Sequence, residues 1–306
     1  MNRTRLIAIA LLAAACTAHT QEDAALLRQK TAAHIDRLID QASGIVGYAA
    51  LDLVSGEALG RNQDLVFPQA SAIKIPILIE VHRQAAAGAI TLTQRLPVTA
   101  ALQVGGSGVA QHFGDGTSAL SVGDLCVLMI TLSDNTATNM LIDLVGMERI
   151  NATLSTLGLT QTAVRRVMMD ARASAQNREN TSTPSEAARL MALLHQGKVV
   201  TPELSADVLR VLAIGKGGAF AAAFPDSVRV AWKPGGIAGV ETVWALVQLP
   251  ERPFACAVME KFDSAGEAGD IQREIARTLF DYYWRLGNAS RYGTFVDPAL
   301  KSQKKQ

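Results

Sequence analysis

"LMITLSDNTATNMLIDLVG", residues 128–146, interrupts an apolar helical pattern with three consecutive polar side chains. Apolar residues recur at helical spacing before and after Ser133, Asp134 and Asn135, which predicts two helices joined by a short turn. Buried polar groups destabilise a fold unless each finds a hydrogen-bond partner. One explanation is an N-cap, in which Ser133 or Asp134 caps the second helix. Such a cap is compatible with a functional role for the triplet.

The same helical periodicity extends through the middle of the chain. Helical spacing of apolar residues, broken by loops that contain Gly and Pro, predicts a helical region from Ser71 to about Gly215. We expect its helices near 71–86, 121–131, 135–145, 147–157, 184–196 and 202–213. Two further helices are predicted near the ends of the chain, at 23–42 and 270–287.

Strand patterns lie on either side of this helical region. "GIVGYAALDLVSGEALGRN" (44–62) alternates and breaks at "SGE", which predicts a hairpin of two strands. Strands are predicted again in "VRVAWKPGG" (228–236), "VETVWALVQLP" (240–250) and "PFACAVMEKF" (253–262). The most economical assembly joins both ends of the chain into one lobe.

The predicted fold class is α+β: an antiparallel sheet of about five strands flanked by the terminal helices, plus an all-helical lobe. We assign residues 21–66 and 214–290 to the sheet lobe, 67–213 to the helical lobe, and 291–306 to a flexible tail. Ligand sites favour the cleft between two such lobes.

The first 20 residues are predicted to be an export signal rather than part of the fold. "MNRTR" is positively charged, "LIAIALLAAA" is an apolar run too short for a transmembrane helix, and small and polar residues follow. We therefore expect an exported, periplasmic protein. The sequence "AAAC" leaves a lipoprotein signal as the alternative, with a lipid anchor on Cys16. Contact with a membrane is expected only in that case.

Charge and cysteine content exclude some classes of partner. The formal net charge is +1 and becomes −1 when Arg3 and Arg5 leave with the signal, so we expect neither a nucleic acid nor an anionic membrane as partner. Cys126 and Cys256 lie in apolar runs and are expected to be buried thiols, with a disulfide as the alternative. The predicted partner is a small molecule, and we expect a monomer without cofactor or metal.

"SAIK" places Ser71 and Lys74 three residues apart at the start of a predicted helix, on one helical face. A serine hydroxyl is a weak nucleophile until a neighbouring base takes its proton, and a desolvated lysine can do so. The pattern alone is weak, because Ser302 and Lys305 in the tail have the same spacing.

Two further motifs contain groups of the same chemistry. Ser133 could carry a proton to a leaving group, and Asn135 could hydrogen-bond a substrate amide. "KPG" ends a predicted strand, where a buried Lys233 would place positive charge beside an anion or oxyanion. A strand end that meets a Pro-Gly turn is the plainer explanation. "KGG" at 216–218 is a similar pattern without a predicted function.

The order and spacing of "SAIK", "SDN" and "KPG" resemble those of the class A serine β-lactamases and the related penicillin-binding acyltransferases. The resemblance extends to "GSGVAQHF" (106–113), "ENTSTPSEAARLM" (179–191) and the closing strand-rich segment. It covers nearly all of the chain after the leader. It implies an active-site-serine hydrolase that opens a β-lactam through an acyl-enzyme.

The resemblance implies a role for each matching residue. Ser71 would be the nucleophile and Lys74 its base, while Ser133 would pass a proton to the departing lactam nitrogen and Lys233 would tune that step. For substrate binding, Asn135 would hold the acyl side-chain amide, and Gly235 would lie against the substrate. The backbone N–H groups of Ser71 and Gly236 would form the oxyanion hole, worth about 3 kcal/mol per donor.

The loop "VRRVMMDARASAQNRENTSTP" (164–184) departs from the class A pattern. That family has a deacylating Glu there, two residues past an Arg, and counting back from "TSTP" puts Val167 at its position. Asp170 and Glu179 are the only acidic residues of the loop. Asp170 could activate a water, or it could tie the loop down. Without such a base, the resemblance implies acylation with slow deacylation.

Pro234 is the second departure. The family has Thr or Ser between this Lys and Gly, and that hydroxyl holds the substrate carboxylate, whereas proline has neither a hydroxyl nor an N–H. Arg229 alternates onto the same strand face as Lys233 and could replace the lost contact, or it could be a solvated strand residue.

Other functional classes fit the sequence less well. "GGSGV" (105–109) lacks the GxSxG pattern of a Ser-His-Asp hydrolase and the lysine of a phosphate loop, and no histidines pair at metal-ligand spacing. The first prediction is therefore β-lactam hydrolysis. The alternatives are a D-alanyl-D-alanine carboxypeptidase or esterase, and a penicillin-binding receptor that stays acylated.

Overall fold

The structure, a computed structural model, describes residues 3–263, 267–290 and 292–295. Its centre is one antiparallel sheet of five strands in the order β2-β1-β9-β8-β7. The strands are β1 (Ile45–Asp52), β2 (Ala58–Arg61), β7 (Arg229–Ile237), β8 (Val240–Gln248) and β9 (Phe254–Lys261). The N-terminal hairpin thus pairs with the C-terminal strands through β1 and β9, as the sequence analysis predicted.

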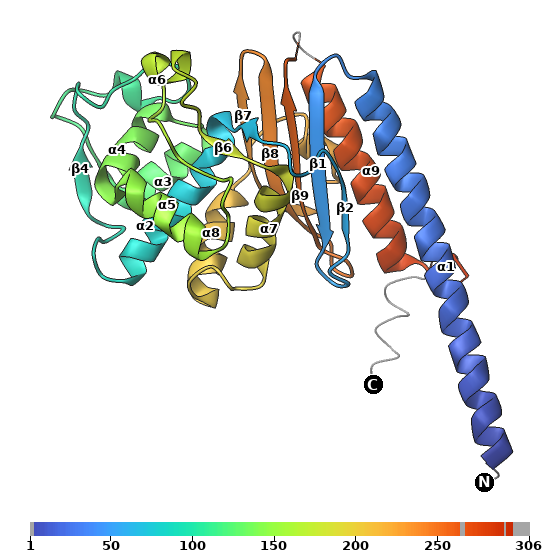
Figure 1. Cartoon of the computed structure of the whole chain (residues 1–306). Coiled ribbons are helices and arrows are strands. Elements are labelled where there is room, and N and C mark those ends of the chain that lie inside the picture. Colours follow the sequence, from blue (N-terminus) through green and yellow to red (C-terminus); the bar gives the residue numbers. More distant parts are fainter. Residues whose placement is uncertain (1–2, 264–266, 291, 296–306) are drawn as a thin grey trace.

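The two long terminal helices cover one face of the sheet. α1 (Arg3–Gln41) and α9 (Ala268–Asn288) lie side by side there, at the right of Figure 1. Alternate residues of β1, β8 and β9 point to this face and pack with aromatic side chains of α9, for example Phe254 on Tyr283 with ring centres 4.3 Å apart. Burial of these apolar surfaces is the main force that holds the helices to the sheet.

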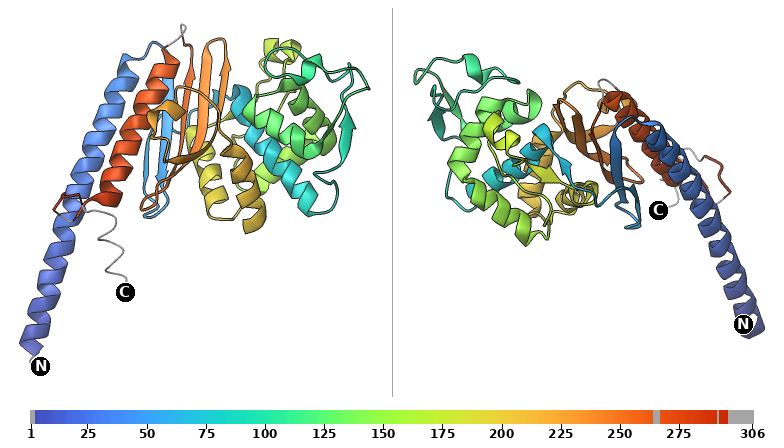
Figure 2. Two further views of the ribbon diagram at one scale, coloured as in Figure 1. Left: turned by 180° about the vertical axis from the view of Figure 1, so that it is seen from behind. Right: turned by 45° about the horizontal axis from the view of Figure 1, so that its top comes forward.

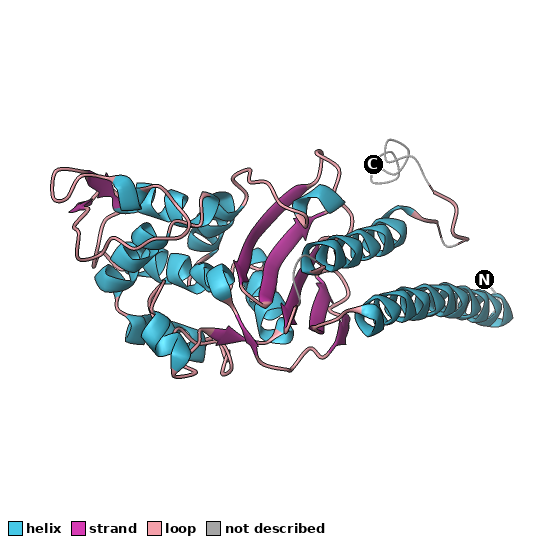
Figure 3. Ribbon diagram, turned by 90° about the horizontal axis from the view of Figure 1, so that it is seen from above, coloured by secondary structure: helices cyan, strands magenta, loops and turns pink. Residues whose placement is uncertain are grey.

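The other face of the sheet carries the second core, which continues into the helical region. Seen from above, the sheet stands between the two groups of helices (Figure 3). α7 (Pro184–His195) lies directly on β1, β8 and β9, so it forms a layer against the sheet although its sequence belongs to the predicted helical lobe. Trp244 is fully buried on this face of the sheet.

The remaining elements build the helical lobe, which the views from behind and above separate clearly from α1 and α9 (Figure 2). Its helices are α2 (Lys74–Ala86), α3 (Val122–Thr131), α4 (Asn135–Val145), α5 (Met147–Thr156), α6 (Ala171–Ala175) and α8 (Pro202–Leu212), with short 3-10 helices η1 (Ala70–Ile73), η2 (Ala110–His112) and η3 (Ala221–Ala223). Two small two-stranded antiparallel sheets complete it: β3 (Phe67–Pro68) with β6 (Thr181–Ser182), and β4 (Arg95–Pro97) with β5 (Ala119–Ser121).

The predicted helices and strands are confirmed to within a few residues, and the α+β fold with its five-stranded sheet is as expected. The sequence analysis missed the very short elements, because two to five residues carry no measurable periodicity. The predicted helix at 23–42 is part of α1, whose backbone continues through the predicted leader. Within the described residues, no helix combines the length and apolar character that a membrane span requires.

The sequence analysis also makes predictions for the two cysteines of the fold and for the C-terminal tail, residues 291–306. Cys126 and Cys256 are free, buried thiols in different cores, on opposite sides of the sheet, so the disulfide alternative is wrong. In the predicted tail, residues 292–295 turn back on α9 through a bridge between Ala289 and Phe295. The rest of the segment 291–306 lies outside the described residues.

Candidate active site

Ser71 lies in the 3-10 turn η1, which leads directly into α2. The residue before it, Ala70, has φ 43°, a left-handed conformation that is strained for a residue with a Cβ atom. Gln69 holds the turn in place: its side chain accepts from Trp244 Nε1 at 2.7 Å, and its carbonyl accepts from Thr242 Oγ1 at 3.0 Å. The sheet therefore fixes the position of the predicted nucleophile, through a buried glutamine that the sequence analysis did not single out.

Lys74, the first residue of α2, is fully buried and reaches the polar triplet. Its Nζ lies 2.6 Å from Ser133 O, 3.1 Å from Ser133 Oγ and 2.9 Å from Asn135 Oδ1. Burial, followed by the positive charge of Lys233, lowers the pKa of Lys74 well below its usual range, while Asp134 opposes that effect. The three acceptors favour the ammonium form, but complete desolvation is the larger effect, and Lys74 is therefore suited to act as a base.

Lys233 approaches the same hydroxyl from β7. Its Nζ donates to Ser133 Oγ at 3.1 Å and to the carbonyl oxygen of Pro234 at 2.9 Å. Burial first, and then the charge of Lys216, lowers its pKa to about 7. Ser133 Oγ thus accepts from two lysines at once, which leaves its own proton free to be donated elsewhere.

Asp134 resolves which residue of the triplet caps the helix. Its Oδ1 accepts from Ala137 N at 2.8 Å, so Asp134 is the N-cap of α4. Its Oδ2 accepts from the N–H groups of Val109 and Ala110, which fixes the loop 105–110 against α4. Ser133 does not cap the helix. Its backbone has φ 53°, a strained conformation, and its side chain contacts Lys74 and Lys233. Local capping and a functional role are therefore divided between neighbouring residues.

Gly235 brings the end of β7 against the nucleophile turn. A Cβ atom at this position would lie 2.7 Å from Ser71 N and 2.6 Å from both Ala72 N and Gln69 O. Only glycine permits this approach, which sets Gly236 at the edge of the cleft next to Ser71. Gly235 itself is buried and does not line the cleft, so its predicted substrate-binding role is replaced by a spacing role.

A cleft of about 480 Å³ opens beside Ser71. Its walls come from η1, the loop at Gly106, the start of α4, the loop 166–174 and the end of β7. Asn135 lies in the wall with its Nδ2 donating to Gly105 O, so its amide is already partly engaged. The described residues that line the cleft are Ala70, Ser71, Gly106, Ser107, Asn135, Arg166, Met168, Met169, Asp170, Ala171, Ser174, Gly236, Ile237 and Ala238.

The loop above the cleft is tied by an ion pair between Arg166 and Glu179, with Nη2 2.8 Å from Oε2. This pair identifies Arg166 as the arginine that anchors the loop, and two residues past it stands Met168 rather than Val167. The prediction of Val167 for this position is therefore wrong by one residue. Met168 is buried, and both its N–H and its carbonyl are hydrogen-bonded to the side chain of Asn139.

Asp170 is the carboxylate of the loop that lines the cleft. Its Oδ1 accepts from Ala173 N at 2.9 Å and caps α6, which favours the tethering role that the sequence analysis left open. Its Oδ2 accepts no hydrogen bond from the described part of the chain, so this oxygen is available to a water molecule. Glu179 is engaged with Arg166 and Ser174 and is excluded as a base.

The structure brings Ser71, Lys74, Ser133, Asn135 and Lys233 together, as expected from their motifs. Arg229 lies exposed at the start of β7 and outside the cleft, so it is a solvated strand residue. Pro234 is tolerated because β7 is the edge strand of the sheet, where a missing N–H breaks no ladder. Met168, Met169 and Ile237 line the cleft and were missed, since their sequence context resembles that of core residues.

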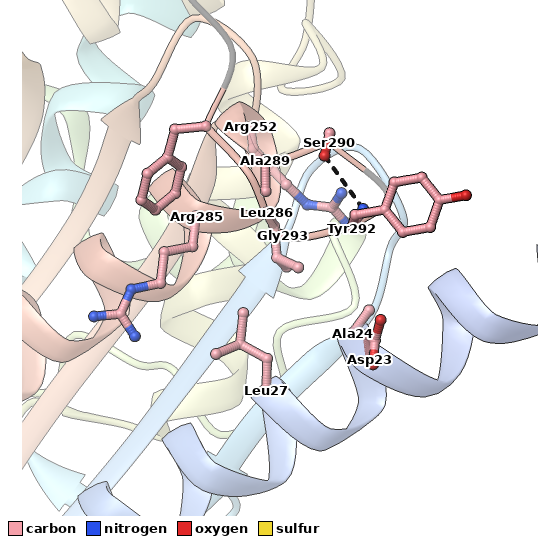
Figure 4. Close-up of a pocket in the computed structure, with 11 residues that line it drawn as sticks. Asp23, Ala24, Leu27, Arg252, Arg285, Leu286, Ala289, Ser290, Tyr292 and Gly293 are labelled. Atoms are coloured by element: carbon pink, nitrogen blue, oxygen red, sulfur yellow. Dashed lines mark hydrogen bonds between the residues drawn. The ribbon is translucent and has the colours of Figure 1, made fainter.

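A larger cavity, of about 660 Å³, lies far from these residues, between α1 and the end of α9 (Figure 4). Leu27 of α1, Arg285 of α9 and Tyr292 lie around it. None of the predicted site residues contributes to its wall. The smaller cleft beside Ser71 is therefore the candidate active site, on the strength of its chemistry.

Comparison with protein-family models matches residues 30–283 to the family described as the beta-lactamase enzyme family. The match spans most of the chain and includes every motif at the site. The chain belongs to the beta-lactamase family.

Curated relatives in this family are moderately similar. Beta-lactamase L2 of Stenotrophomonas maltophilia is 30% identical over 200 residues, which is 63% of this chain and 64% of that protein. A beta-lactamase of Rhodobacter capsulatus is 28% identical over 172 residues, 55% of this chain and 58% of that protein. The chain thus matches somewhat less than two thirds of the length of each relative.

Solved structures of the family superpose over nearly their full length. A beta-lactamase from Sphaerobacter thermophilus has a TM-score of 0.78 at 30% identity, covering 83% of this chain and 97% of that one. PBP-A has a TM-score of 0.77 at 27% identity, covering 83% and 96%. A variant of PBP-A, solved as an acyl-enzyme complex with penicillin G, has a TM-score of 0.76 at 27% identity, covering 85% and 97%. The family and its fold are thereby established.

Proposed function

We propose that this chain is an exported serine hydrolase that β-lactams acylate at Ser71. The observation that supports this most strongly is the array in which Lys74 and Lys233 both contact Ser133 Oγ, at 3.1 Å each, next to the Ser71 turn. Two buried amines and a proton-carrying hydroxyl meet in one network, whose members come from α2, the α3–α4 turn and β7. The proposed nucleophile, Ser71, lies in η1, directly before α2, and lines the cleft.

The acylation step follows from this arrangement. Ser71 Oγ attacks the lactam carbonyl carbon while neutral Lys74 accepts the hydroxyl proton, and the oxyanion lies against the N–H groups of Ser71 and Gly236. The C–N bond then breaks, and the lactam nitrogen takes the proton of Ser133, which Lys74 replaces. The product is an ester on Ser71 and a free amine. Lys233 stabilises the negative charge that develops beside it.

Deacylation requires a water and a base to remove its proton, and here the site is less complete. Met168 stands two residues past Arg166, and Asp170 is the one carboxylate in the described wall of the cleft. We propose that hydrolysis is slow and that Asp170, through its second oxygen, is the available base. The apolar wall at Met168 favours the alternative, a penicillin-binding protein or D-alanyl-D-alanine carboxypeptidase that stays acylated by penicillin.

The proposed location follows from the leader alone. A charged start, an apolar run and small residues before Gln21 indicate export to the periplasm, with Cys16 as the lipid-bearing residue in the alternative case. Mass spectrometry of the protein purified from its native membrane and periplasmic fractions tests both. A mature N-terminus near residue 21 supports simple export, a diacylated Cys16 supports the anchor, and an intact residue 1 overturns both.

The experiment that tests the function is intact-mass analysis of the protein mixed with benzylpenicillin, sampled from seconds to hours. A transient adduct with accumulating penicilloic acid indicates a β-lactamase. An adduct that persists for hours indicates the penicillin-binding alternative, and turnover of a D-Ala-D-Ala peptide then identifies a carboxypeptidase. The absence of any adduct would overturn acylation by β-lactams.

A further inference from the structure

The proposed oxyanion hole takes its two donors from separate segments of the chain. The N–H group of Ser71 belongs to the turn η1, and that of Gly236 belongs to the end of the edge strand β7. The two segments meet at Gly235, where a Cβ atom would lie 2.7 Å from Ser71 N and 2.6 Å from Gln69 O. Because an oxyanion must lie within about 3 Å of both donors, catalysis depends on how these segments are held together.

Thr242 contacts the backbone of both segments from β8, the strand beside β7 (Figure 1). It is fully buried and pairs in register with Gly235. Its Oγ1 donates to Gln69 O at 3.0 Å and lies 3.3 Å from Gly235 O. A hydroxyl group has one proton, so the two carbonyl groups share this donor. One threonine hydroxyl thus bridges the nucleophile turn and the strand that carries Gly236.

The two carbonyl groups are closely linked to the two N–H donors. The C=O group of Gly235 and the N–H group of Gly236 belong to one planar peptide unit and point in opposite directions. A contact that holds the oxygen toward β8 therefore directs the N–H group toward the open edge of the sheet, where Gly236 lines the cleft. In the other segment, Gln69 O also accepts from Ala72 N at 2.9 Å, which closes the turn that contains Ser71.

Gln69 is fixed by further contacts, so the Thr242 hydroxyl joins β7 to a well-held part of the molecule. Gln69 is fully buried, its N–H group donates to Asn180 O at 2.8 Å, and its Nε2 donates to Phe67 O at 2.9 Å. Its Oε1 accepts from Trp244, which lies two residues after Thr242 on the same face of β8. The β-branched side chain of Thr242 has few rotamers, so its hydroxyl has a defined direction.

We propose that Thr242 is a positioning residue of the oxyanion hole. Its hydroxyl, shared between the carbonyl oxygens of Gln69 and Gly235, sets how far apart the two N–H donors lie and where they point. Its effect on activity rests on the proposed function, in which the lactam oxygen becomes an oxyanion between these donors. Thr242 is buried and is not part of the described cleft wall, so it acts through the backbone rather than by touching the substrate.

The effect should appear in the acylation step and not in the initial non-covalent binding of a β-lactam. The oxyanion forms only when Ser71 Oγ adds to the carbonyl carbon, so misplaced donors destabilise the transition state more than the bound substrate. Complete loss of one donor costs about 10²–10³-fold in rate. Displaced donors still form weaker hydrogen bonds, so we expect a loss of about tenfold when the hydroxyl is removed.

The test compares Thr242→Val, which keeps the shape of the side chain without its hydroxyl, with Thr242→Ser, which keeps a hydroxyl. Thr153→Val is the matched control, because Thr153 is also buried and its Oγ1 donates to Glu80 Oε2 at 2.7 Å, away from the cleft. Each Val variant should lose about 1–3 kcal/mol of stability, which leaves a domain of this size folded.

Stopped-flow acylation by nitrocefin, a chromogenic cephalosporin, separates the acylation rate constant from the dissociation constant of the first complex. We expect the rate constant of Thr242→Val to fall about tenfold while its dissociation constant stays unchanged. Thr242→Ser and Thr153→Val should remain within about threefold of the parent rate constant. A parent-like rate constant in Thr242→Val would overturn the inference. Equal losses in the two Val variants would also overturn it, because they would show general destabilisation.

Crystal structures of the parent protein, Thr242→Val and Thr242→Ser give a second readout that needs no β-lactam. The separation between Ser71 N and Gly236 N should change in Thr242→Val and return to the parent value in Thr242→Ser. The same separation in all three proteins would contradict a positioning role. If no protein, the parent included, is acylated, the proposed function fails, and the crystal structures alone decide the role of Thr242.

Discussion

The two halves of the proposed reaction are served by very different regions of the molecule. The region for acylation is a dense polar network in which Lys74, Ser133, Asn135 and Lys233 contact one another. The region for deacylation, the loop tied by Arg166 and Glu179, presents methionine to the cleft. In the proposed reaction, the groups for acylation are joined in one network, whereas the loop offers Asp170 as its only carboxylate in the described wall of the cleft.

The physical contrast lies in how each region treats buried polar groups. Lys74 and Lys233 are fully buried, yet each has at least two hydrogen-bond partners, so their desolvation is offset. In the loop, the side chain of Asn139 satisfies the backbone of Met168, a buried residue that lines the cleft. Of the loop residues that line the cleft, Met168, Met169 and Ala171 are apolar, whereas Arg166, Asp170 and Ser174 are polar. Arg166 and Ser174 are both engaged with Glu179, and Asp170 caps α6.

The largest expected effect is in the acylation region. Ser71→Ala removes the nucleophile, so covalent labelling by benzylpenicillin should disappear, a loss of at least about 10³-fold in rate. Intact-mass analysis measures it. Ser302→Ala, in the same SxxK spacing, is the control and should label like the parent protein. Labelling that survives in Ser71→Ala would refute every catalytic role assigned here.

The next prediction converts the deacylation region. Met168→Glu places a carboxylate two residues past Arg166, and we expect the acyl-enzyme lifetime to fall by about 10²-fold, the contribution of a well-placed general base. The lifetime is read from the decay of the mass adduct. Met168→Gln has the same size without a base, so equal lifetimes in the two variants would show that Met168 does not occupy the water-activating position.

Asp170 gives a smaller effect that separates tether from base. Asn is as good an N-cap as Asp, so Asp170→Asn should keep α6 and the melting temperature, whereas Asp170→Ala should destabilise the protein by about 1 kcal/mol. If Asp170 is the base, deacylation slows about tenfold or more in both variants. Unchanged deacylation in a folded Asp170→Asn variant would leave Asp170 as a tether only.

Pro234→Thr tests the substrate-binding side of the acylation region. The added hydroxyl would offer a hydrogen bond to the carboxylate of a β-lactam, with a net gain of about 1 kcal/mol, or about fivefold in acylation rate. Pro234→Val, which has a similar shape without a hydroxyl, is the control. A gain in both variants would point to backbone freedom rather than to the hydroxyl.

The smallest effect separates stability from catalysis in the pH profiles. Glu260 is fully buried on β9, and neither carboxylate oxygen has a hydrogen-bond partner among the described residues. Burial, followed by the charges of Asp263, Glu267 and Glu241, raises its pKa from 4.5 to about 7. The folded state thus binds a proton that the unfolded state has lost, and stability should fall as pH rises from 4.5 to about 7.

Urea unfolding of the parent protein and Glu260→Gln across this pH range measures the effect. The parent should lose stability steadily and then level off above the folded pKa, while Glu260→Gln should lack that component. Parallel slopes in the two proteins would contradict it. The comparison also separates two pH effects: the loss of stability that comes from Glu260, and the change in activity that comes from the lysines of the acylation region.

Much of the fold followed from local pattern. Helical and alternating periodicities located the main helices and strands, because each spans several turns or pleats. The residues of the acylation network were also found, since their motifs have fixed spacings. The loop 164–184 could not be aligned from sequence alone, because its residues follow no regular period. The sequence analysis predicts Val167 at the position two residues past the anchoring arginine, whereas the Arg166–Glu179 ion pair places Met168 there.

By itself the sequence determined the secondary structure, the order of the motifs and the absence of a glutamate at the expected place in the loop. Only the tertiary structure decided that Asp134 rather than Ser133 caps α4 and that Gly235 is a spacer between β7 and the Ser71 turn. The reason is physical. Propensity and periodicity act between near neighbours in the chain, whereas desolvation and charge coupling depend on which distant segments the packed core brings together.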